Sequence, residues 1–418
     1  MMIPTKKSIN VFIHTLHLGA LKLTAGSHIS DLERFKSQLN EYPERAFLLA
    51  GSDDYIILNH YPDKDYLDYL MAIGIGTQNI LMPTIAGESL ADRVFKDEQL
   101  LEFLRNLGTG KNQVVLHPYI STLVETKIAK SINAIVNGSP PDLTTLINNK
   151  IYLPTFLEEL ALPIPEYEIA NSVTVVNTAK NFISKYANKI IILGEHTYGG
   201  MAVWKITDEQ SFNRFKLDVS KCQATERFLV EKMYDVLHSP NIQYNIGHNY
   251  IHELGITEQI LDDKLRHHCN TTPSSTIQLE KIRNHSHCIS EKLQSQGYRG
   301  LVGIDFIDTN EGNIFAVDIN GRANASSFGL NVIRKLFPDS YQQKYFKILT
   351  NVSVGKRTTF LELKNIFGTD NLFTKQSKQG ILPYNVGLLQ WGKFSAVIIA
   401  NTFSDANRWH SMLYSNPK

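Results

Sequence analysis

The sequence predicts a multidomain α/β protein, and three observations support this prediction. Apolar strand-like segments alternate with helix-like segments between Ala46 and Leu116. A stretch dense in turn-forming residues follows at Asn137–Asp142 and separates this part from the rest of the chain. Two apolar strands joined by a short turn lie much later, between Tyr298 and Gly329. A chain of 418 residues is long enough for two or three domains with separate cores.

The bulk composition is that of an ordinary soluble globular protein, with 43% hydrophobic and 20% charged residues. Its 42 Lys and Arg residues nearly balance 41 Asp and Glu residues, so the charge indicates neither nucleic acid nor an anionic membrane as a partner. The three cysteines form no C-x-x-C motif, which favours a reducing compartment. The first residues do not resemble a signal peptide, and no apolar run is long enough for a membrane helix. We therefore expect a cytoplasmic protein.

The first 140 residues alternate between strands and helices and predict an α/β layer. The expected strands are Ala46–Ala50, Tyr55–Leu58, Asn79–Met82 and Val114–Leu116, and the expected helices are Asp65–Ile73 and Leu90–Leu107. Few glycines occur in the turns, which argues against a dinucleotide-binding role.

A hairpin with a glycine-rich tip is predicted next, with strands at Ile190–Leu193 and Met201–Ile206 and a loop at Gly194–Gly200. Glycines allow backbone N–H groups to approach phosphate oxygens closely. The apolar strand Phe228–Met233 follows, and a helix is expected from Thr276 to Gln296. The chain ends in a small α/β unit beyond residue 340.

The two strands near residue 310 carry the most informative polar side chains. Asp305 interrupts one apolar strand, while Asp318 and Asn320 lie two residues apart on the other. Because strand side chains alternate, Asp318 and Asn320 should share one face and Val317 and Ile319 should point into the core. Two carboxylates and an amide oxygen are hard ligands of the kind that Mg2+ accepts.

Arg322 follows this strand directly and can grip a phosphate or a developing oxyanion with two parallel hydrogen bonds. The alternative interpretation is an edge hairpin whose polar side chains face solvent, as most Asp and Asn residues do. The apolar character of both strands argues against that alternative.

This stretch resembles the end of the catalytic domain of ATP-grasp ligases, where a GxxGxDF strand precedes an acid-x-Asn-x-Arg pattern. The resemblance implies that Asp305, Asp318 and Asn320 bind Mg2+ at the ATP phosphates, and that Arg322 is catalytic. Two positions depart from the family pattern: Asp318 stands where the family usually has Glu, and Gly321 stands where it often has Pro.

The resemblance also assigns nucleotide contacts. Lys150, in an Asn-x-Lys segment, is the candidate phosphate-binding lysine, and Gly199 and Gly200 would lie over the phosphates. A lysine normally precedes this loop in the family, but Leu193 occupies that position. The candidates to replace it are Lys189 and Lys205.

The strand that ends at Met233 looks like the family's hinge between its two nucleotide-binding lobes. The resemblance implies that backbone groups of Lys232 and Met233 meet the adenine edge, and that Glu231 meets adenine or ribose.

The family resemblance implies a pre-ATP-grasp α/β domain at residues 1–140, an ATP-grasp domain at 141–340 with a mobile lobe at about 170–232, and a small C-terminal domain at 341–418. It implies ATP and Mg2+ as cofactors, with two ions expected and Mn2+ as an alternative. The SPxxQ and GITxQxL segments, at Ser239–Gln243 and Gly255–Leu261, resemble the pheganomycin-type peptide ligases in particular.

The implied activity is an ADP-forming carboxylate–amine ligase that makes an amide or peptide bond through an acyl phosphate, in small-peptide or natural-product biosynthesis. Its partners would be a small carboxylate and an amine or peptide, and domains of this kind are often found in homodimers. Two alternatives stay open: a regulatory or scaffold protein that binds ATP without catalysis, and a kinase that stops at phosphoryl transfer.

Overall fold

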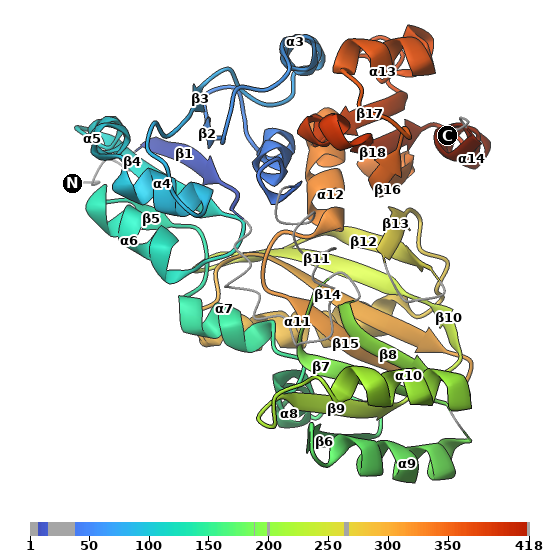
Figure 1. The fold of residues 1–418 in the computed structure, drawn as a ribbon. Coiled ribbons are helices and arrows are strands. Elements are labelled where there is room, and N and C mark those ends of the chain that lie inside the picture. The colour runs from blue at the N-terminus through green and yellow to red at the C-terminus, as the bar shows by residue number, and fades with distance from the viewer. Residues whose placement is uncertain (1–6, 16–37, 188, 199–200, 263–266, 416–418) are drawn as a thin grey trace.

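The computed structural model describes residues 7–15, 38–187, 189–198, 201–262 and 267–415. Strands in these ranges form three sheets, and helices cover them, so the predicted α/β class is confirmed (Figure 1). The largest sheet lies between an N-terminal sheet and a small lobe at the opposite end (Figure 1). Within the described ranges, no helix combines the length and the apolar character needed to span a bilayer.

The N-terminal sheet has five parallel strands in the order β3-β2-β1-β4-β5. Its strands are β1 (Lys7–Ile13), β2 (Tyr55–Ile57), β3 (Ile80–Leu81), β4 (Asn112–Pro118) and β5 (Ile135–Val136). The helices of this part are η1 (Tyr42–Leu48), α3 (Lys64–Ile73), α4 (Leu90–Lys96), α5 (Glu98–Leu107) and α6 (Leu123–Ser131). Helices α4, α5 and α6 share a core with one face of β1 and β4.

Two predictions in this region are wrong in detail. The apolar run Ala46–Ala50 does not form a strand, because most of it lies in the 3-10 helix η1, in which Pro43 occupies the first turn. A short apolar run without alternation fits either structure, and proline is well suited to a helix start. The predicted helix Leu90–Leu107 is two helices, because the Asp97 side chain accepts the Leu100 N–H and so begins α5.

The small lobe is a four-stranded sheet in the order β6-β9-β7-β8. It consists of β6 (Tyr167–Asn171), β7 (Ile190–Tyr198), β8 (Met201–Ile206), β9 (Arg227–Lys232), α9 (Val175–Tyr186) and α10 (Glu209–Val219). The predicted loop is shorter than expected, because β7 continues through Gly194 to Tyr198. Gly199 and Gly200 lie outside the described residues.

The two faces of this lobe differ. Ile190, Ile192 and Val230 pack with α9 and α10 in one core. Because strand side chains alternate, the odd-numbered neighbours Ile191 and Glu231 point to the opposite face. The candidate active site lies on that opposite face.

The large sheet has nine strands, in the order β10-β14-β11-β12-β13-β16-β18-β17, and β15 pairs with β14. They are β10 (Val236–His238), β11 (Pro240–Ile246), β12 (Ile251–Leu261), β13 (His267–Thr271), β14 (Gly300–Thr309), β15 (Ile314–Asn320), β16 (Tyr345–Ser353), β17 (Gly380–Tyr384) and β18 (Lys393–Ala400). The other helices are α7 (Pro141–Ile147), α8 (Tyr152–Glu159), α11 (Leu279–Ser295), α12 (Ala325–Leu336), α13 (Phe360–Phe367), α14 (Phe403–Ser415), η2 (Tyr341–Gln343), η3 (Thr369–Asn371) and η4 (Val386–Trp391). Helices α8 and α11 pack on one face of β11, β14 and β15.

The C-terminal strands do not form a sheet of their own. β16 pairs with β13, so β16, β17 and β18 extend the large sheet. They also share one core with η1, α12 and the face of β1 that carries Phe12. The beginning and the end of the chain therefore pack on each other.

A buried pair of acids joins these two ends. Glu44 Oε2 accepts the N–H of Gly387 at 2.8 Å, and Glu41 Oε1 accepts from Gln390 Nε2 at 2.9 Å. His60 lies 2.6 Å from Glu41. Burial, and secondarily Glu41, raises the pKa of Glu44 to about 7, while the Gly387 N–H and His60 oppose the rise.

We predict that Glu44→Gln stabilises the protein at alkaline pH. The pKa of Glu44 is higher in the folded than in the unfolded chain, so the folded state loses stability as the pH rises from about 4.5 through 7. Gln cannot ionise and still accepts the Gly387 N–H. Urea unfolding should show the variant more stable by roughly 2 kcal/mol at pH 8.5 and equal to the parent near pH 4.5. Glu102→Gln, on the exposed side of α5, is the control. A gain that is the same at both pH values would contradict the prediction.

Candidate active site

The three predicted metal ligands converge on the β14–β15 pair. Asp305 and Asp318 lie directly opposite each other in the antiparallel ladder. Asn320 Nδ2 donates to Asp305 Oδ2 and to Asp318 Oδ2, in both cases at 3.2 Å. Directly paired residues point to the same face, so both carboxylates face away from α8 and α11.

A β-bulge shapes this face. Asp305 pairs with Asp318, but the next residue, Phe306, pairs with Ala316, so Val317 has no partner on β14. Val317 is half-exposed and lies outside the core, contrary to the expectation from simple alternation. The bulge also places Phe315 on the same face as Asp318, where its ring lies 4.9 Å from that of Tyr234.

Hydrogen-bond donors surround Asp305. Asn241 Nδ2 and Gln259 Nε2 both donate to Oδ1, the latter at 2.9 Å. Burial, and then the charge of Asp318, raises the pKa of Asp305 to about 6, while Asn241, Lys150 and Gln259 oppose the rise. Two adjacent carboxylates with this little positive charge around them fit a divalent cation.

The orientation of Asn320 bears on that fit. Its Oδ1 accepts from Arg322 Nη2 at 2.9 Å, so its NH2 group faces the carboxylates. A half-turn of the amide would present Oδ1 to a cation between the two carboxylates. The donor set of two carboxylates and one amide oxygen therefore suits Mg2+.

Lys150 lies beside the carboxylates. It is 8% exposed, its ammonium forms an ion pair with Asp318 Oδ1, and its N–H donates to the Glu195 carbonyl at 3.0 Å. Glu231 is close as well: burial raises its pKa to about 7, and the charge of Lys150 opposes that rise. Lys150 thus connects the carboxylate pair of the large sheet with strand β7 of the small lobe.

Lys205 lies on the face of the small lobe that points away from α9 and α10. Ile191 pairs with Glu231 on one side and with Lys205 on the other, so these three side chains share that face. Leu193 lies two residues along β7 on the same face. Lys205 is exposed, and none of the described residues forms an ion pair with it. Its position suits the role of the lysine that is missing at Leu193.

Lys189 is placed differently. Its ammonium lies 2.8 Å from Asp235, and both side chains are exposed. Its carbonyl accepts the N–H of Met233 at 3.0 Å, while the N–H of Lys232 donates to the Glu166 carbonyl at 2.9 Å. The backbone N–H groups of Lys232 and Met233 therefore have protein partners, and the predicted contact of this backbone with adenine stays a prediction. The Lys232 ammonium lies 3.3 Å from Glu311 and over the Tyr234 ring.

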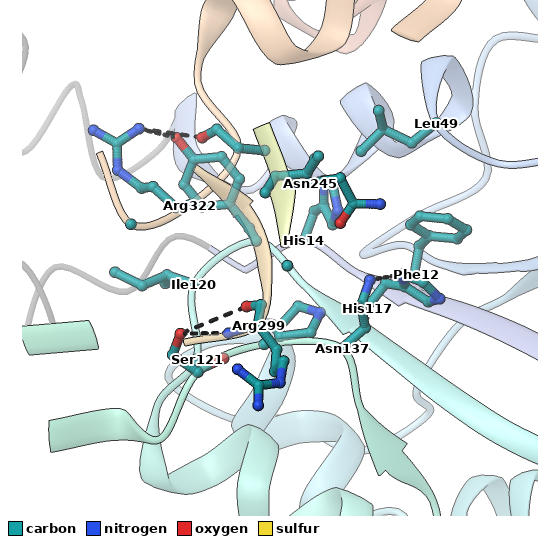
Figure 2. Close-up of a pocket in the computed structure, with 18 of the residues that line it drawn as sticks. Phe12, His14, Leu49, His117, Ile120, Ser121, Asn137, Asn245, Arg299 and Arg322 are labelled. Atoms are coloured by element: carbon teal, nitrogen blue, oxygen red, sulfur yellow. Dashed lines mark hydrogen bonds between the residues drawn. The ribbon is translucent and has the colours of Figure 1, made fainter. Parts of the chain in front are cut away.

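A cavity of about 180 Å3 lies between the N-terminal sheet and the large sheet (Figure 2). Arg322 connects it with the carboxylates: Nη2 reaches Asn320, and Nη1 donates to the Tyr119 hydroxyl at 3.2 Å. Arg299 also lines the cavity, and Figure 2 shows it well apart from Arg322. No Asp or Glu is among the lining residues that the structure describes, so the charged groups of that wall are these two guanidiniums.

Two histidines in the wall stay neutral. Burial lowers the pKa of His117 to about 4 and that of His14 to about 3. His117 Nε2 lies 3.0 Å from Asn10 Oδ1 and its Nδ1 lies 3.0 Å from Asn137 Nδ2, so the ring is held on both sides. The second contact makes Nδ1 the acceptor and places the proton on Nε2.

Sequence analysis missed most of this cavity. His14 follows β1, His117 lies on β4 and Asn245 lies on β11, and no local motif joins these positions. Two polar residues at the ends of neighbouring parallel strands would have been the available signal. For Arg299 the sequence offered only its position ahead of the Asp305 strand.

The geometry defines a class of protein. A small lobe with Lys205 on the face opposite α9 and α10 meets a large sheet that carries paired carboxylates, and a parallel α/β sheet precedes both, which is the architecture of an ATP-grasp fold with a pre-ATP-grasp domain. A family model for L-aspartate–L-methionine ligase, ATP grasp, matches residues 174–320, and one for the pre-ATP-grasp domain matches residues 43–134. The predicted resemblance to the ATP-grasp ligases is therefore confirmed. The narrower likeness to pheganomycin-type ligases stays a prediction.

Individual relatives are distant. The [butirosin acyl-carrier protein]–L-glutamate ligase of Niallia circulans is 23% identical over 304 residues, which make up 69% of this chain and 66% of that protein. A solved N5-carboxyaminoimidazole ribonucleotide synthetase with ADP has a TM-score of 0.60 at 12% identity, covering 99% of this chain and 97% of the other. The Aspergillus clavatus N5-carboxyaminoimidazole synthase, with ADP and 5-aminoimidazole ribonucleotide, has a TM-score of 0.59 at 11% identity, covering 99% of each chain.

A third solved structure contains magnesium. The biotin carboxylase domain of the Hydrogenobacter thermophilus 2-oxoglutarate carboxylase, with MgADP and bicarbonate, has a TM-score of 0.59 at 12% identity. It covers 98% of this chain and 90% of its own. At these identities the structural likeness establishes the fold alone.

We predict that Lys205→Met weakens the binding of a non-hydrolysable ATP analogue about tenfold, or ~1.4 kcal/mol, because a phosphate loses a cationic partner on the inner face of the lobe. Lys189→Met removes the same charge from the same strand pair but only breaks an exposed ion pair, so it should change the affinity less than about twofold. Isothermal titration calorimetry with Mg2+ measures both. A larger loss with Lys189→Met would reverse the assignment.

Proposed function

We propose that the protein is an ATP-dependent, ADP-forming carboxylate–amine ligase that makes an amide or peptide bond through an acyl phosphate. The observation that supports this most is the convergence of Asp305, Asp318 and Asn320 beside Arg322, which also reaches the cavity. A site for Mg-nucleotide and a site for a small acid would thus share one arginine. The setting we propose is small-peptide or natural-product biosynthesis.

The proposed chemistry has two steps. A carboxylate oxygen of the acid attacks the γ-phosphorus of ATP, and the bond to the leaving ADP oxygen breaks. The amine nitrogen then attacks the acyl carbon, the bond to the phosphate oxygen breaks, and the nitrogen loses a proton. Charge neutralisation and positioning dominate the first step, so cationic groups and metal ligands matter more than a protein nucleophile.

Each group has a role under this proposal. Asp305, Asp318 and Asn320 would hold Mg2+, as two ions with Mn2+ as an alternative, and the metal would neutralise phosphate charge. Arg322 would orient the acid's carboxylate and stabilise the oxyanion that forms on amine attack. The remaining nucleotide contacts that we propose are Lys150, Lys205 and Glu231, the backbone at Lys232 and Met233, and the loop at Gly199 and Gly200. The domain divisions near residues 140 and 340 and a homodimer stay predictions.

The cavity supports an anionic acid substrate. Among the described residues its wall contains two guanidiniums and no carboxylate, so a substrate with two carboxylates would find a cationic partner for each. Arg299 donates to the Gln294 and Tyr298 carbonyls and to His248, and it has no carboxylate partner among the described residues. The matching family model is that of an L-aspartate–L-methionine ligase, and the butirosin relative is an L-glutamate ligase. We therefore propose an acidic amino acid as the acid substrate, with its second carboxylate near Arg299.

We predict that ATP is consumed only when a suitable acid is present and that an amide accumulates only when an amine is added as well. ADP release measured against panels of acids and amines, with mass detection of the product, tests this. ADP without any amide in every combination would indicate a kinase, and nucleotide binding without ADP would indicate a regulatory protein.

Asp318→Ala and Asn320→Ala should each lower turnover at least about a hundredfold, since each removes a metal ligand. Asp370→Ala, an exposed acid in η3, is the control.

We also predict that the enzyme prefers L-aspartate to L-asparagine by at least about tenfold in KM, because only aspartate offers Arg299 a carboxylate. Arg299→Gln should reduce that preference to about twofold or less, and Arg299→Lys should keep part of it. Circular dichroism and thermal unfolding check that the variants fold, since Arg299 also bonds the carbonyls at the end of α11. An unchanged preference in folded Arg299→Gln would contradict this role.

A further inference from the structure

The face of the large sheet that carries Asp305 contains an unusual number of fully buried polar side chains. Asn241 and Gln243 on β11 have no exposed surface, and neither does Ser327 on α12. Burying an amide is unfavourable unless its donors and acceptors are all paired. Apolar side chains would fill the same space without that requirement, so the presence of these amides calls for a reason.

These side chains form a chain of hydrogen bonds that ends at the metal ligand. Ser327 Oγ donates to Gln243 Oε1 at 2.6 Å, and Gln243 Nε2 donates to Asn241 Oδ1 at 2.7 Å. Asn241 Nδ2 in turn donates to Asp305 Oδ1. Gln243 Nε2 also donates to Asn324 Oδ1 at 3.0 Å, the side chain that caps the start of α12.

The direction of these bonds follows from the chemistry of the groups. An ionised carboxylate only accepts, so Asn241 has to present its NH2 group to Asp305. Its oxygen then has to face Gln243, which must offer its own NH2 group there. This leaves the oxygen of Gln243 to accept the hydroxyl of Ser327. Reversing any one amide would set two donors or two acceptors against each other.

The backbone makes room for this arrangement at Gly303. Gln243 and Gly303 are paired across β11 and β14. A Cβ atom at residue 303 would lie 2.4 Å from Gln243 Nε2 and 2.3 Å from Asn324 Nδ2. Only glycine leaves space for the two amides.

The two oxygens of Asp305 consequently differ in how many hydrogen bonds they accept. Asn241 and Gln259 both donate to Oδ1, whereas Oδ2 receives only Asn320 Nδ2, the group that lies between the two carboxylates. We propose that Gln243 is a positioning residue: acting through Asn241, it holds Asp305 so that Oδ2 alone is presented to the cation. This inference rests on the proposed function only in its assumption that a divalent cation binds Asp305 and Asp318.

The test measures the binding of Mn2+ and not the formation of an amide product. Electron paramagnetic resonance titration of the full chain with Mn2+ and ADP yields the Mn2+ affinity directly. Gln243→Met keeps the volume of the side chain and removes its hydrogen bonds, and we expect it to weaken Mn2+ binding about tenfold. Asn270→Leu is the matched control, because Asn270 is a buried amide on β13 that bonds Thr257 and His267 and has no contact with Asp305. Asn270→Leu should lower the Tm as much as Gln243→Met does and leave the Mn2+ affinity unchanged.

A double-variant cycle tests the route through Asn241. In an Asn241→Leu background, Gln243→Met should weaken Mn2+ binding by less than about twofold, because the link to Asp305 is already absent. Independent losses that multiply in the double variant would overturn the proposal. So would equal Mn2+ affinities of Gln243→Met and the parent, or a parent protein that binds no Mn2+. A parent that binds Mn2+ but forms no amide would instead refute the ligase function and leave the positioning role standing.

Discussion

Two like charges held side by side are the constraint around which this site is built. Asp305 and Asp318 face each other across one strand pair, and the charge of Asp318 disfavours ionisation of Asp305. The surrounding protein supplies amide donors and the ammonium of Lys150. These groups hold the carboxylates in place, and the carboxylate pair still suits a divalent cation. The bulge at Val317 serves the same end, because it brings Phe315 onto the carboxylate face and extends that face toward the hinge.

Arg322 joins this constraint to the rest of the molecule. One nitrogen of its guanidinium holds the Asn320 amide, and the other reaches Tyr119 in the N-terminal sheet. The cavity wall beyond it combines residues from β1, β4, β11 and the segment before β14, which are far apart in the sequence. Arg322 thus links the cavity wall to the carboxylates through Asn320.

The hairpin that carries the candidate metal ligands could be predicted from the sequence because its information is local. Asp305, Asp318 and Asn320 lie on two strands joined by one turn, so alternation and a short hairpin are enough to bring them together. The same rule failed at Val317, since a bulge depends on packing that a local pattern does not contain. Ala46–Ala50 failed for a related reason: a short apolar run fits a buried helix as well as a strand. The cavity lay beyond prediction because its residues meet only in three dimensions.

The core shared by η1, β1 and the strands β16–β18 has a consequence for how the chain reaches its native state. One face of the N-terminal sheet is covered by α4, α5 and α6, whereas the other shares a core with η1 and α3 and also with α12 and β16–β18, which come much later in the sequence. Contacts of such long sequence separation form slowly and late. During synthesis this second core would therefore stay incomplete, with part of its apolar surface uncovered, until the last strands have left the ribosome.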